Sequence, residues 1–259
     1  MNTNKLYWYD ELNSIKYNLQ INTIENFEKK NTTINSHVNN TKFIVPHTKW
    51  STDFIQRTKT HELKTNKKLL ELLLSCPENE YIIDAGSHIG DTGLLMANEL
   101  KVKNIKSKII EIDPDKTKIS FINEMTKLNK LTNYISTHIL GLSNNKTKGS
   151  LNKTLHPGGW YIKKGSDFTI DKLDNVIKSK TYLIKLDVEG NELNALIGAI
   201  NIIKQDSPLL FIEVCDKQLK RYGHSTKMLY DFLKKNNYKE VWYDDTRDRS
   251  NTDVLFKKN

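Results

Sequence analysis

Cysteine and arginine are both scarce in this 259-residue chain, and each scarcity argues against a class of protein. The two cysteines, Cys76 and Cys215, lie far apart, with no histidine or second cysteine at ligand spacing. They predict free thiols rather than a disulfide framework or a zinc site. Four of the 40 basic residues are arginine, the side chain most used for bidentate phosphate and base recognition. The net charge of +9 therefore indicates a lysine-rich solvated surface, with nucleic-acid binding as the alternative.

Long apolar runs are absent as well. No stretch approaches the roughly 20 apolar residues that a membrane span needs. The N-terminal sequence MNTNKLYWYDELNSIKYN lacks the apolar core of a signal peptide. We therefore expect a soluble cytoplasmic protein with no membrane partner.

Residues 1–65 differ in character from the rest of the chain. They are rich in Asn, Thr and Lys, and their apolar residues follow no clear period. We expect an N-terminal extension or lid that packs against the following domain, with a partly disordered tail as the alternative. Residues 66–259 form that following domain.

Helix and strand patterns alternate from residue 67 onward. Short apolar runs predict strands at 81–84, 107–113, 134–142, 181–187 and 208–214, and helical spacing predicts helices at 67–75, 90–100, 115–130, 192–203 and 225–236. Residues 238–244 and 252–258 predict a terminal antiparallel hairpin. Strands separated by helices of this length indicate an α/β fold with a doubly wound, mostly parallel seven-stranded sheet.

The turn after the first predicted strand has the features of a ligand-binding loop. The strand ends at Asp84, and Gly86 and Gly90 lie on either side of the turn into a helix. Gly86 permits a sharp turn and a close approach of the backbone to a ligand, and the helix N-terminus offers free N–H groups. Ligands of parallel sheets bind at this carboxyl end of the strands. A glycine turn by itself, however, suits several nucleotide cofactors.

The second predicted strand narrows the choice of cofactor. It ends in EIDP at 111–114, roughly 20 residues after the turn, where a carboxylate reaches a ribose diol. Asp113 is the first choice for that contact, and Glu111, on the same face of the strand, is the second. The bulky residues SHI at 87–89 disfavour the close backbone approach that the pyrophosphate of NAD needs. S-adenosylmethionine is therefore the expected cofactor.

Several segments together resemble the FkbM-type methyltransferases. The chain has DAGSHIGDT at 84–92 where the family has D-x-G-A-N-I-G-D-T, and KLDVEGNE at 185–192 where it has K-x-D-V-E-G-x-E. Asp113-Pro114-Asp115 matches the end of the family's second strand, and SPLLFIEV at 207–214 matches a later proline-led strand. The match covers roughly residues 80–215 and implies the Rossmann-like class I methyltransferase fold.

The resemblance implies methyl transfer from S-adenosylmethionine to a hydroxyl of a sugar, a glycan or another small natural product. It places Asp84 and Gly86 near the methionine part of the cofactor, Asp113 near the ribose, and Asp187 and Glu189 at the mouth of the site. The expected cofactor-binding residues are Asp84, Gly86, Ser87, His88, Gly90, Asp91, Thr92, Glu111, Asp113, Ser143 and Asp187.

Two positions depart from the family pattern. His88 stands where the family usually has asparagine, which puts a side-chain amide contact in doubt. Leu140-Gly141-Leu142 stands where members often have Ala-Leu-Ser, and Ser143 and Asn144 are the candidates for the adenine contact.

Methyl transfer to a hydroxyl requires an aligned acceptor and a group that takes up its proton. Asp187, at the end of an apolar strand, is expected to orient the acceptor or act as the base. Glu189 follows on the loop and is expected to bind cofactor or acceptor, whereas Glu192 serves equally well as a helix cap. His156, in the turn-rich LHPGGW segment, and His224 are further candidates for the base. The expected catalytic residues are Asp187, Glu189, His156 and Glu213.

Alternatives remain open at this stage. Asp187, Glu213 and Asp216 could hold a magnesium ion, but nothing in their spacing requires it, and no metal is expected. The positive charge suggests an RNA methyltransferase as a second function, and a non-catalytic binding module is a third. The expected partner is a small-molecule or sugar acceptor; whether the chain forms a homodimer is open.

Overall fold

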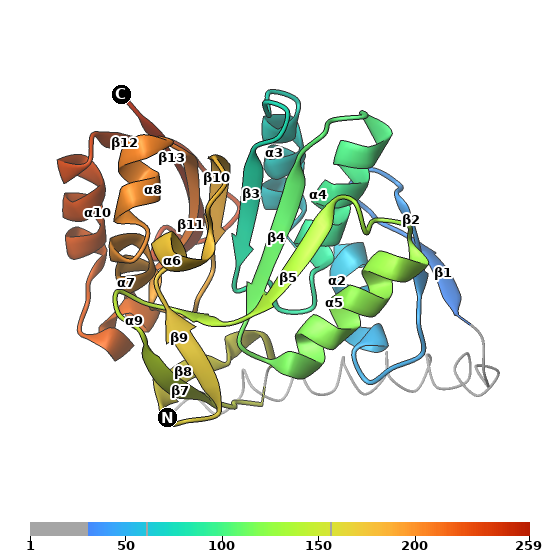
Figure 1. Ribbon diagram of the computed structural model, residues 1–259, viewed down its shortest axis with the longest axis horizontal. Helices are drawn as coiled ribbons and strands as arrows, with labels where there is room; N and C mark the ends of the chain where they lie inside the picture. Colours follow the sequence, from blue (N-terminus) through green and yellow to red (C-terminus); the bar gives the residue numbers. More distant parts are fainter. Residues whose placement is uncertain (1–30, 61, 156) are drawn as a thin grey trace.

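The centre of the protein is a seven-stranded sheet with the order β12-β13-β11-β10-β3-β4-β5 (Figure 1). The computed structural model describes residues 31–60, 62–155 and 157–259. Five strands pair in parallel, namely β3 (Tyr81–Ala85), β4 (Lys108–Asp113), β5 (Ile135–Ile139), β10 (Thr181–Leu186) and β11 (Leu209–Cys215). The terminal hairpin of β12 (Tyr238–Tyr243) and β13 (Asn251–Lys258) completes the sheet, with β13 antiparallel to β11. The sheet is therefore mixed, and its parallel strands run through the centre.

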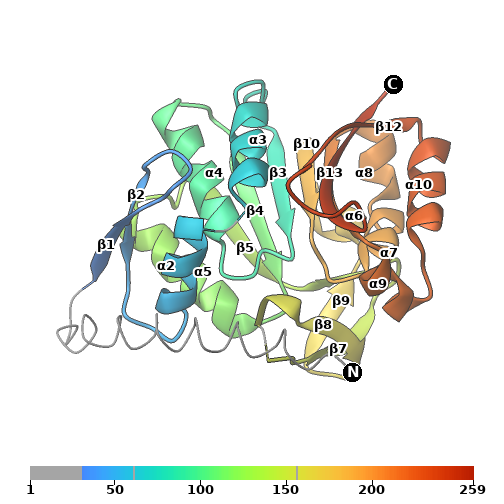
Figure 2. The ribbon, with the colours of Figure 1, turned by 180° about the vertical axis from the view of Figure 1, so that it is seen from behind.

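Helices cover both faces of the sheet, as a doubly wound fold requires (Figures 1 and 2). On one face lie α3 (Leu63–Leu73), α4 (Asp91–Val102) and α5 (Lys116–Leu128), and on the other α6 (Leu173–Val176), α7 (Glu192–Ile197), α8 (Ile200–Gln205) and α10 (Thr226–Lys235). Consecutive residues of β3 alternate between the two cores: Ile82 packs with the first group and Ile83 with the second. Strands buried on both faces are continuously apolar, which is why YII and LLFI are recognisable in the sequence.

The segment before the sheet packs on the α4–α5 side. It consists of a hairpin, β1 (Thr32–Asn35) and β2 (Lys42–Val45), followed by α2 (Ser51–Thr60). Phe43, Trp50 and Phe54 of this segment are buried in the same core as α4 and α5, and Figure 2 shows the hairpin and α2 beside these helices. The predicted boundary at 65/66 falls inside α3. Residues 1–30 of the predicted extension lie outside the described residues, so its role as a lid stays a prediction.

One predicted strand is divided between two sheets. The apolar run 134–142 forms β5 and then β6 (Gly141–Leu142), which leaves the main sheet. β6 joins a four-stranded sheet with β9 (Phe168–Asp171), β7 (Thr147–Asn152) and β8 (Tyr161–Lys164), in the order β6-β9-β7-β8. The period of the sequence does not change at this point, so it did not reveal the change of sheet.

One predicted helix is likewise divided. Residues 192–203 form α7 and part of α8, which are separated at Gly198, where a Cβ atom would lie 2.1 Å from the carbonyl oxygen of Ser143. The short helical segments are α9 (Asp216–Leu219), η1 (Pro157–Gly159) and η2 (Lys220–Tyr222). Among the helices of the described residues, none combines the length and the apolar content needed to cross a bilayer.

Candidate active site

Two adjoining pockets open at the carboxyl ends of the parallel strands. The first, here the β4 cleft, is lined by Ile112, Asp113 and Pro114 at the end of β4 and by Leu140, Gly141 and Leu142. The second, here the acidic pocket, lies between β3, β10, β11 and the end of α2, with Asp84, Lys185 and Glu213 in its wall. The two pockets share Gly86, His88, Gly158, Asp187 and Glu189. A ligand in one pocket therefore faces a ligand in the other across these shared residues.

Gly86 joins the glycine loop to the end of β10. Its φ of 80° lies in the region that favours glycine, and a Cβ atom there would lie 1.7 Å from the carbonyl oxygen of Asp187. The Gly86 amide donates a hydrogen bond to the carbonyl oxygen of Ile112 at 2.9 Å. This packing brings the two sequence motifs, DAGSHIGDT and KLDVEGNE, into direct contact.

Asp113 lies at the tip of β4, where the sequence predicted the ribose contact. Its side chain is buried, with 6% of the residue exposed, and lines the β4 cleft. One carboxylate oxygen accepts the amide of His88 at 3.1 Å and the other accepts the amide of Asp115 at 2.8 Å. Burial raises the pKa of Asp113 to about 6, although Lys118 and the two amides favour the charged form. Each oxygen has a second lone pair, so the carboxylate can accept two further hydrogen bonds from a diol.

Glu111, the second candidate, does not reach the cleft. It is fully buried beneath α4, where a Cβ atom on Gly93 would lie 1.6 Å from its Oε1 atom. Burial and the neighbouring Asp84 raise its pKa well above the ordinary value. Glu111 is not among the described residues that line the two pockets. Of the two candidate carboxylates, Asp113 is therefore the one that a ribose in the cleft could reach.

The remaining loop residues fall into two groups. Ser87, Asp91 and Thr92 line the acidic pocket, and His88 lines both pockets. Asp91 accepts a hydrogen bond from Arg57 Nε of α2 at 2.9 Å, whereas the Thr92 hydroxyl donates to Asn66 of α3 at 3.2 Å.

Gly90 and Ser143 lie behind the lining residues. Gly90 packs against Ile122 of α5, whose Cγ1 atom would be 2.8 Å from an added Cβ. The Ser143 amide donates to the carbonyl oxygen of Asp171 at 3.1 Å. The wall on the predicted adenine side is formed by Leu140, Gly141 and Leu142, and Ser143 is not part of it. A side-chain contact from Ser143 to the adenine stays a prediction, and the residues that line this wall are its immediate neighbours.

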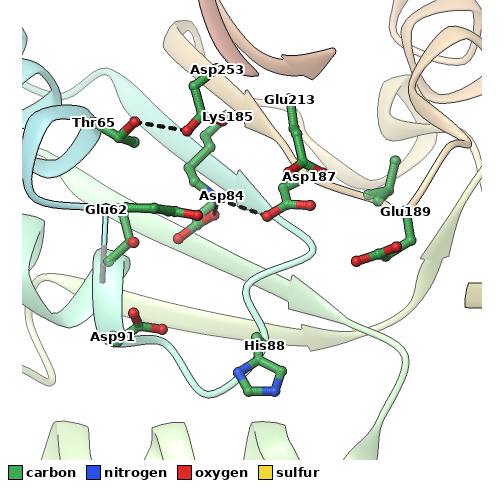
Figure 3. A network of polar contacts seen from close by, with 12 residues as sticks. Glu62, Thr65, Asp84, His88, Asp91, Lys185, Asp187, Glu189, Glu213 and Asp253 are labelled. Carbon is green, nitrogen blue, oxygen red and sulfur yellow. Dashed lines mark hydrogen bonds and ion pairs between the residues drawn. The ribbon is translucent and has the colours of Figure 1, made fainter. Parts of the chain in front are cut away.

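Asp187 lies at the point where the two pockets meet. Its amide donates to the carbonyl oxygen of Ala85 at 3.0 Å, and 27% of its side chain is exposed. Lys185 Nζ lies 4.0 Å from Asp187 Oδ2 and 3.3 Å from Asp84 Oδ1 (Figure 3). The side chain is therefore partly open to a ligand and has a buried cation behind it.

The two glutamates of KLDVEGNE have different environments. Glu189 lines both pockets, and its Oε2 atom accepts hydrogen bonds from Gln218 at 3.0 Å and from Arg221 at 3.2 Å. Burial and repulsion by Asp187 raise the pKa of Glu189 to about 7. Glu192 is buried, and its Oε1 atom accepts the amides of Val188 and Gly190 at 3.1 and 3.0 Å. Glu192 therefore stabilises the loop and the start of α7, the alternative that the sequence left open.

Glu213 reaches the acidic pocket from the end of β11. Its Oε1 atom pairs with Arg247 at 2.7 Å, and Arg247 also pairs with Asp253 at 3.1 Å and Glu62 at 3.7 Å. Burial, Asp187 and Asp253 raise the pKa of Glu213 well above its ordinary value.

Asp216 does not lie in the pocket that Asp187 and Glu213 line, so the three residues named for a magnesium ion are not brought together. Its side chain accepts the amide of Thr226 at 3.1 Å and pairs with Lys220 at 2.6 Å, and it lines a separate surface pocket. Within residues 31–60, 62–155 and 157–259, no three His, Cys, Asp or Glu side chains are grouped to hold a metal ion.

Of the two histidine candidates for the base, the structure describes His224. His156 lies outside the described residues. His224 follows Gly223 before α10, is absent from the described lining of both pockets, and has a pKa lowered by burial. Besides His88, the described side chains that both pockets share and that can accept a proton are the carboxylates of Asp187 and Glu189.

Sequence reasoning missed the basic residues of the acidic pocket. Arg57 comes from α2, Lys185 from β10 and Arg247 from the β12–β13 hairpin. Two of these three residues are arginines, and the whole chain has four. The positions of so few arginines were the signal in the sequence that could have pointed to this pocket. The pocket lining contains three basic and six acidic side chains, and each basic group already pairs with a carboxylate. The lining acids are Glu62, Asp84, Asp91, Asp187, Glu189 and Glu213.

The mixed seven-stranded sheet and the cleft at the carboxyl ends of its parallel strands are the arrangement of the class I methyltransferase fold. The chain belongs to the FkbM methyltransferase family, because the model of the methyltransferase FkbM domain matches residues 84–240, more than half of the chain. A search of curated proteins gave no match.

Two solved structures have the same fold. The methyltransferase FkbM from Methylobacillus flagellatus is 22% identical, with a TM-score of 0.51 over 80% of this chain and 53% of that one. A protein of Pyrococcus horikoshii, provisionally assigned as a transferase, is 14% identical, with a TM-score of 0.51 over 89% of this chain and 72% of that one. The chain thus spans about half the length of the Methylobacillus protein, and these identities support the fold alone.

Proposed function

We propose that this chain is an S-adenosylmethionine-dependent O-methyltransferase whose acceptor is a hydroxyl of a sugar, a glycan or another small natural product. The observation that carries the proposal is the junction of the β4 cleft with the acidic pocket at Asp187. A donor bound along the cleft and an acceptor bound in the pocket would meet beside a carboxylate.

The residues of the β4 cleft fit the cofactor. Asp113 would hold the ribose diol, and Leu140 and Leu142 would contact the adenine. Gly86 lines the cleft and brings the backbone close to a ligand without a side chain, which suits the methionine part. Asp84 lies in the adjoining acidic pocket. When bound, S-adenosylmethionine supplies an activated methyl group.

Asp187 and Glu189 are the residues that act on the acceptor. Asp187 orients the hydroxyl, since its side chain is partly exposed at the junction. A carboxylate here takes up the proton as the new bond forms, and such general-base assistance is worth on the order of 10²–10⁴ in rate. Glu189, whose pKa is raised to about 7, is suited to the same transfer because it exchanges a proton near neutral pH.

The charge of the acidic pocket supports a sugar over RNA as the acceptor. Among the described residues of this lining, each of the three cations is already paired with a carboxyl group, so the lining offers no free cation to a phosphate backbone. Neutral hydroxyl groups, in contrast, donate hydrogen bonds to carboxylates. An uncharged polyhydroxylated acceptor therefore fits this lining best.

The test is methyl transfer from tritium-labelled S-adenosylmethionine to a panel of neutral glycosides, oligosaccharides and phenolic hydroxyl compounds, with bulk RNA as a parallel substrate. Label in a glycoside, absent with Asp187→Asn, supports the proposal, and label in RNA alone overturns the acceptor. Calorimetry with S-adenosylhomocysteine tests the cofactor separately. If no heat of binding is measured at millimolar ligand, the remaining function is that of a binding module that retains the methyltransferase fold.

A further inference from the structure

A lysine ammonium is buried in the floor of the acidic pocket. The Lys185 side chain is 6% exposed, and its Nζ atom lies between Asp84 and Asp187, at 3.3 and 4.0 Å. Figure 3 shows the three side chains converging from neighbouring strands. Lys185 and Asp187 are two residues apart, so they leave the chain on the same side of the strand, and the lysine lies directly behind the aspartate.

The pairing register explains why the ammonium is there. Lys185 of β10 lies opposite Asp84 of β3, which lies opposite Glu111 of β4. Three ionisable side chains therefore form one row across the centre of the sheet, beneath α3 and α4. Burial and Asp84 raise the pKa of Glu111 well above the ordinary value. Burial also raises the pKa of Asp84, but Lys185 opposes that shift. By distance, Asp84 at 3.3 Å is the first counter-ion of Lys185 and Asp187 at 4.0 Å the second.

Lys185 remains charged in this position. Burial alone would lower its pKa, but Asp84 and Asp187 raise it above the ordinary value. Asp84 is 1% exposed, and neither of its oxygens accepts a hydrogen bond within the described part of the chain. The ion pair with Lys185 is therefore the interaction that offsets the burial of this carboxylate. Other charged groups that act on Lys185 or Asp187 include Glu62, Asp253, Glu189, Glu192 and Glu213. Glu213 is paired with Arg247.

We propose that Lys185 is a positioning residue of the transfer reaction, which acts through Asp187. Its ammonium links the carboxylate at the junction to Asp84 in the floor and holds the Asp187 side chain directed toward the acceptor. The catalytic consequence rests on the proposed function, whereas the contact itself does not.

Chemical labelling of Asp187 tests the contact without cofactor or acceptor. A water-soluble carbodiimide with glycine ethyl ester modifies protonated carboxyl groups, and peptide mass spectrometry quantifies the product at Asp187 between pH 5 and 8. Removal of a cation about 4 Å away favours the protonated form. In Lys185→Met, the labelling yield at Asp187 should therefore exceed that of the wild type at the same pH, and Lys185→Arg should restore the wild-type profile.

Lys180→Met is the matched control. Lys180 immediately precedes β10 at its other end, and its ammonium pairs with Glu80 at 2.6 Å while its side chain is 63% exposed. This variant should label Asp187 as the wild type does. An unchanged Asp187 profile in Lys185→Met would overturn the proposal.

Should Lys185→Met fail to fold because Asp84 is left buried and unpaired, the comparison of Asp84→Asn with Asp84→Asn/Lys185→Met makes the same measurement with the buried pair removed. Once the screen yields an acceptor, Lys185→Met should slow methyl transfer about tenfold or more, with partial recovery in Lys185→Arg. Transfer at the wild-type rate would refute the positioning role. A screen that yields no acceptor would count against the proposed function and leave the labelling result intact.

Discussion

Replacement of Asp113 by alanine should weaken the binding of S-adenosylhomocysteine by about 1–3 kcal/mol, or roughly 5- to 150-fold in Kd. The loss corresponds to charge-assisted hydrogen bonds from a ribose diol to a carboxylate. Asp113 also accepts the His88 amide at 3.1 Å, so the alanine variant loses support for the glycine loop and should fall toward the upper end of this range. Asp113→Asn, which keeps one side-chain oxygen, should fall between the wild type and the alanine variant.

The pH dependence of binding provides a second measurement. Burial raises the pKa of Asp113 to about 6, and the charged form is the one that accepts both hydroxyls. Affinity in the wild type should therefore be constant above pH 7 and should fall as the pH decreases below about 6, whereas Asp113→Asn should lose this dependence.

Calorimetry at pH 8 and pH 5.5 measures both effects, with the exposed Asp167→Ala as the control for a lost surface carboxylate. Wild-type affinity in Asp113→Ala at pH 8 would refute the assignment of the ribose contact.

Three further predictions concern the loop, the fold and the reaction. Gly86→Ala should lower the free energy of unfolding by about 3 kcal/mol or more, because its Cβ atom would overlap the Asp187 carbonyl. Gly223 has a similar φ of 74°, but no atom lies within 4 Å of its added Cβ, so Gly223→Ala should lower it by about 1 kcal/mol. Urea unfolding measures both losses, and equal losses would contradict the prediction. Glu192 has its pKa raised to about 7 by burial, so the folded state binds its proton more tightly than the unfolded chain and stability should fall as the pH rises from about 4.5 to 7. Glu192→Gln should flatten that slope and be more stable than the wild type at pH 8 by on the order of 1–3 kcal/mol, and a parallel stability curve would count against the shift. Asp187→Asn should bind S-adenosylhomocysteine like the wild type but transfer methyl groups on the order of 10²-fold more slowly; undiminished turnover would remove Asp187 from the mechanism.

Local patterns were sufficient to predict most of the sheet. A strand buried on both faces is apolar at nearly every position, so YIID and LLFI predicted β3 and β11, and the residues that follow them predicted the site edge. The same reasoning failed where a local pattern continues through a tertiary change. The run 134–142 contains no sign that β6 leaves the main sheet, and Gly198 divides a continuous helical pattern because it packs against Ser143.

The candidate site shows the same division. Gly86, Asp113, Asp187 and Glu189 were predicted because each follows a strand, and the carboxyl ends of parallel strands meet at one edge of the sheet. Asp216 was wrongly grouped with these residues because of its tertiary contacts. It also follows a strand, but α9 begins at this residue and turns its side chain to the start of α10.

The sequence by itself determined the order and type of the main elements and the motifs that identify the family, because these depend on the period of neighbouring residues. The tertiary structure alone decided which charges meet. Glu111 and Asp113 have the same strand parity, and the packing of Gly93 on Glu111 buries one and leaves the other in the cleft. Arg57 and Arg247 lie 190 positions apart in the chain, and they line one pocket because α2 and the terminal hairpin pack against the same sheet edge. Such pairings depend on the packing of distant segments, which no local period encodes.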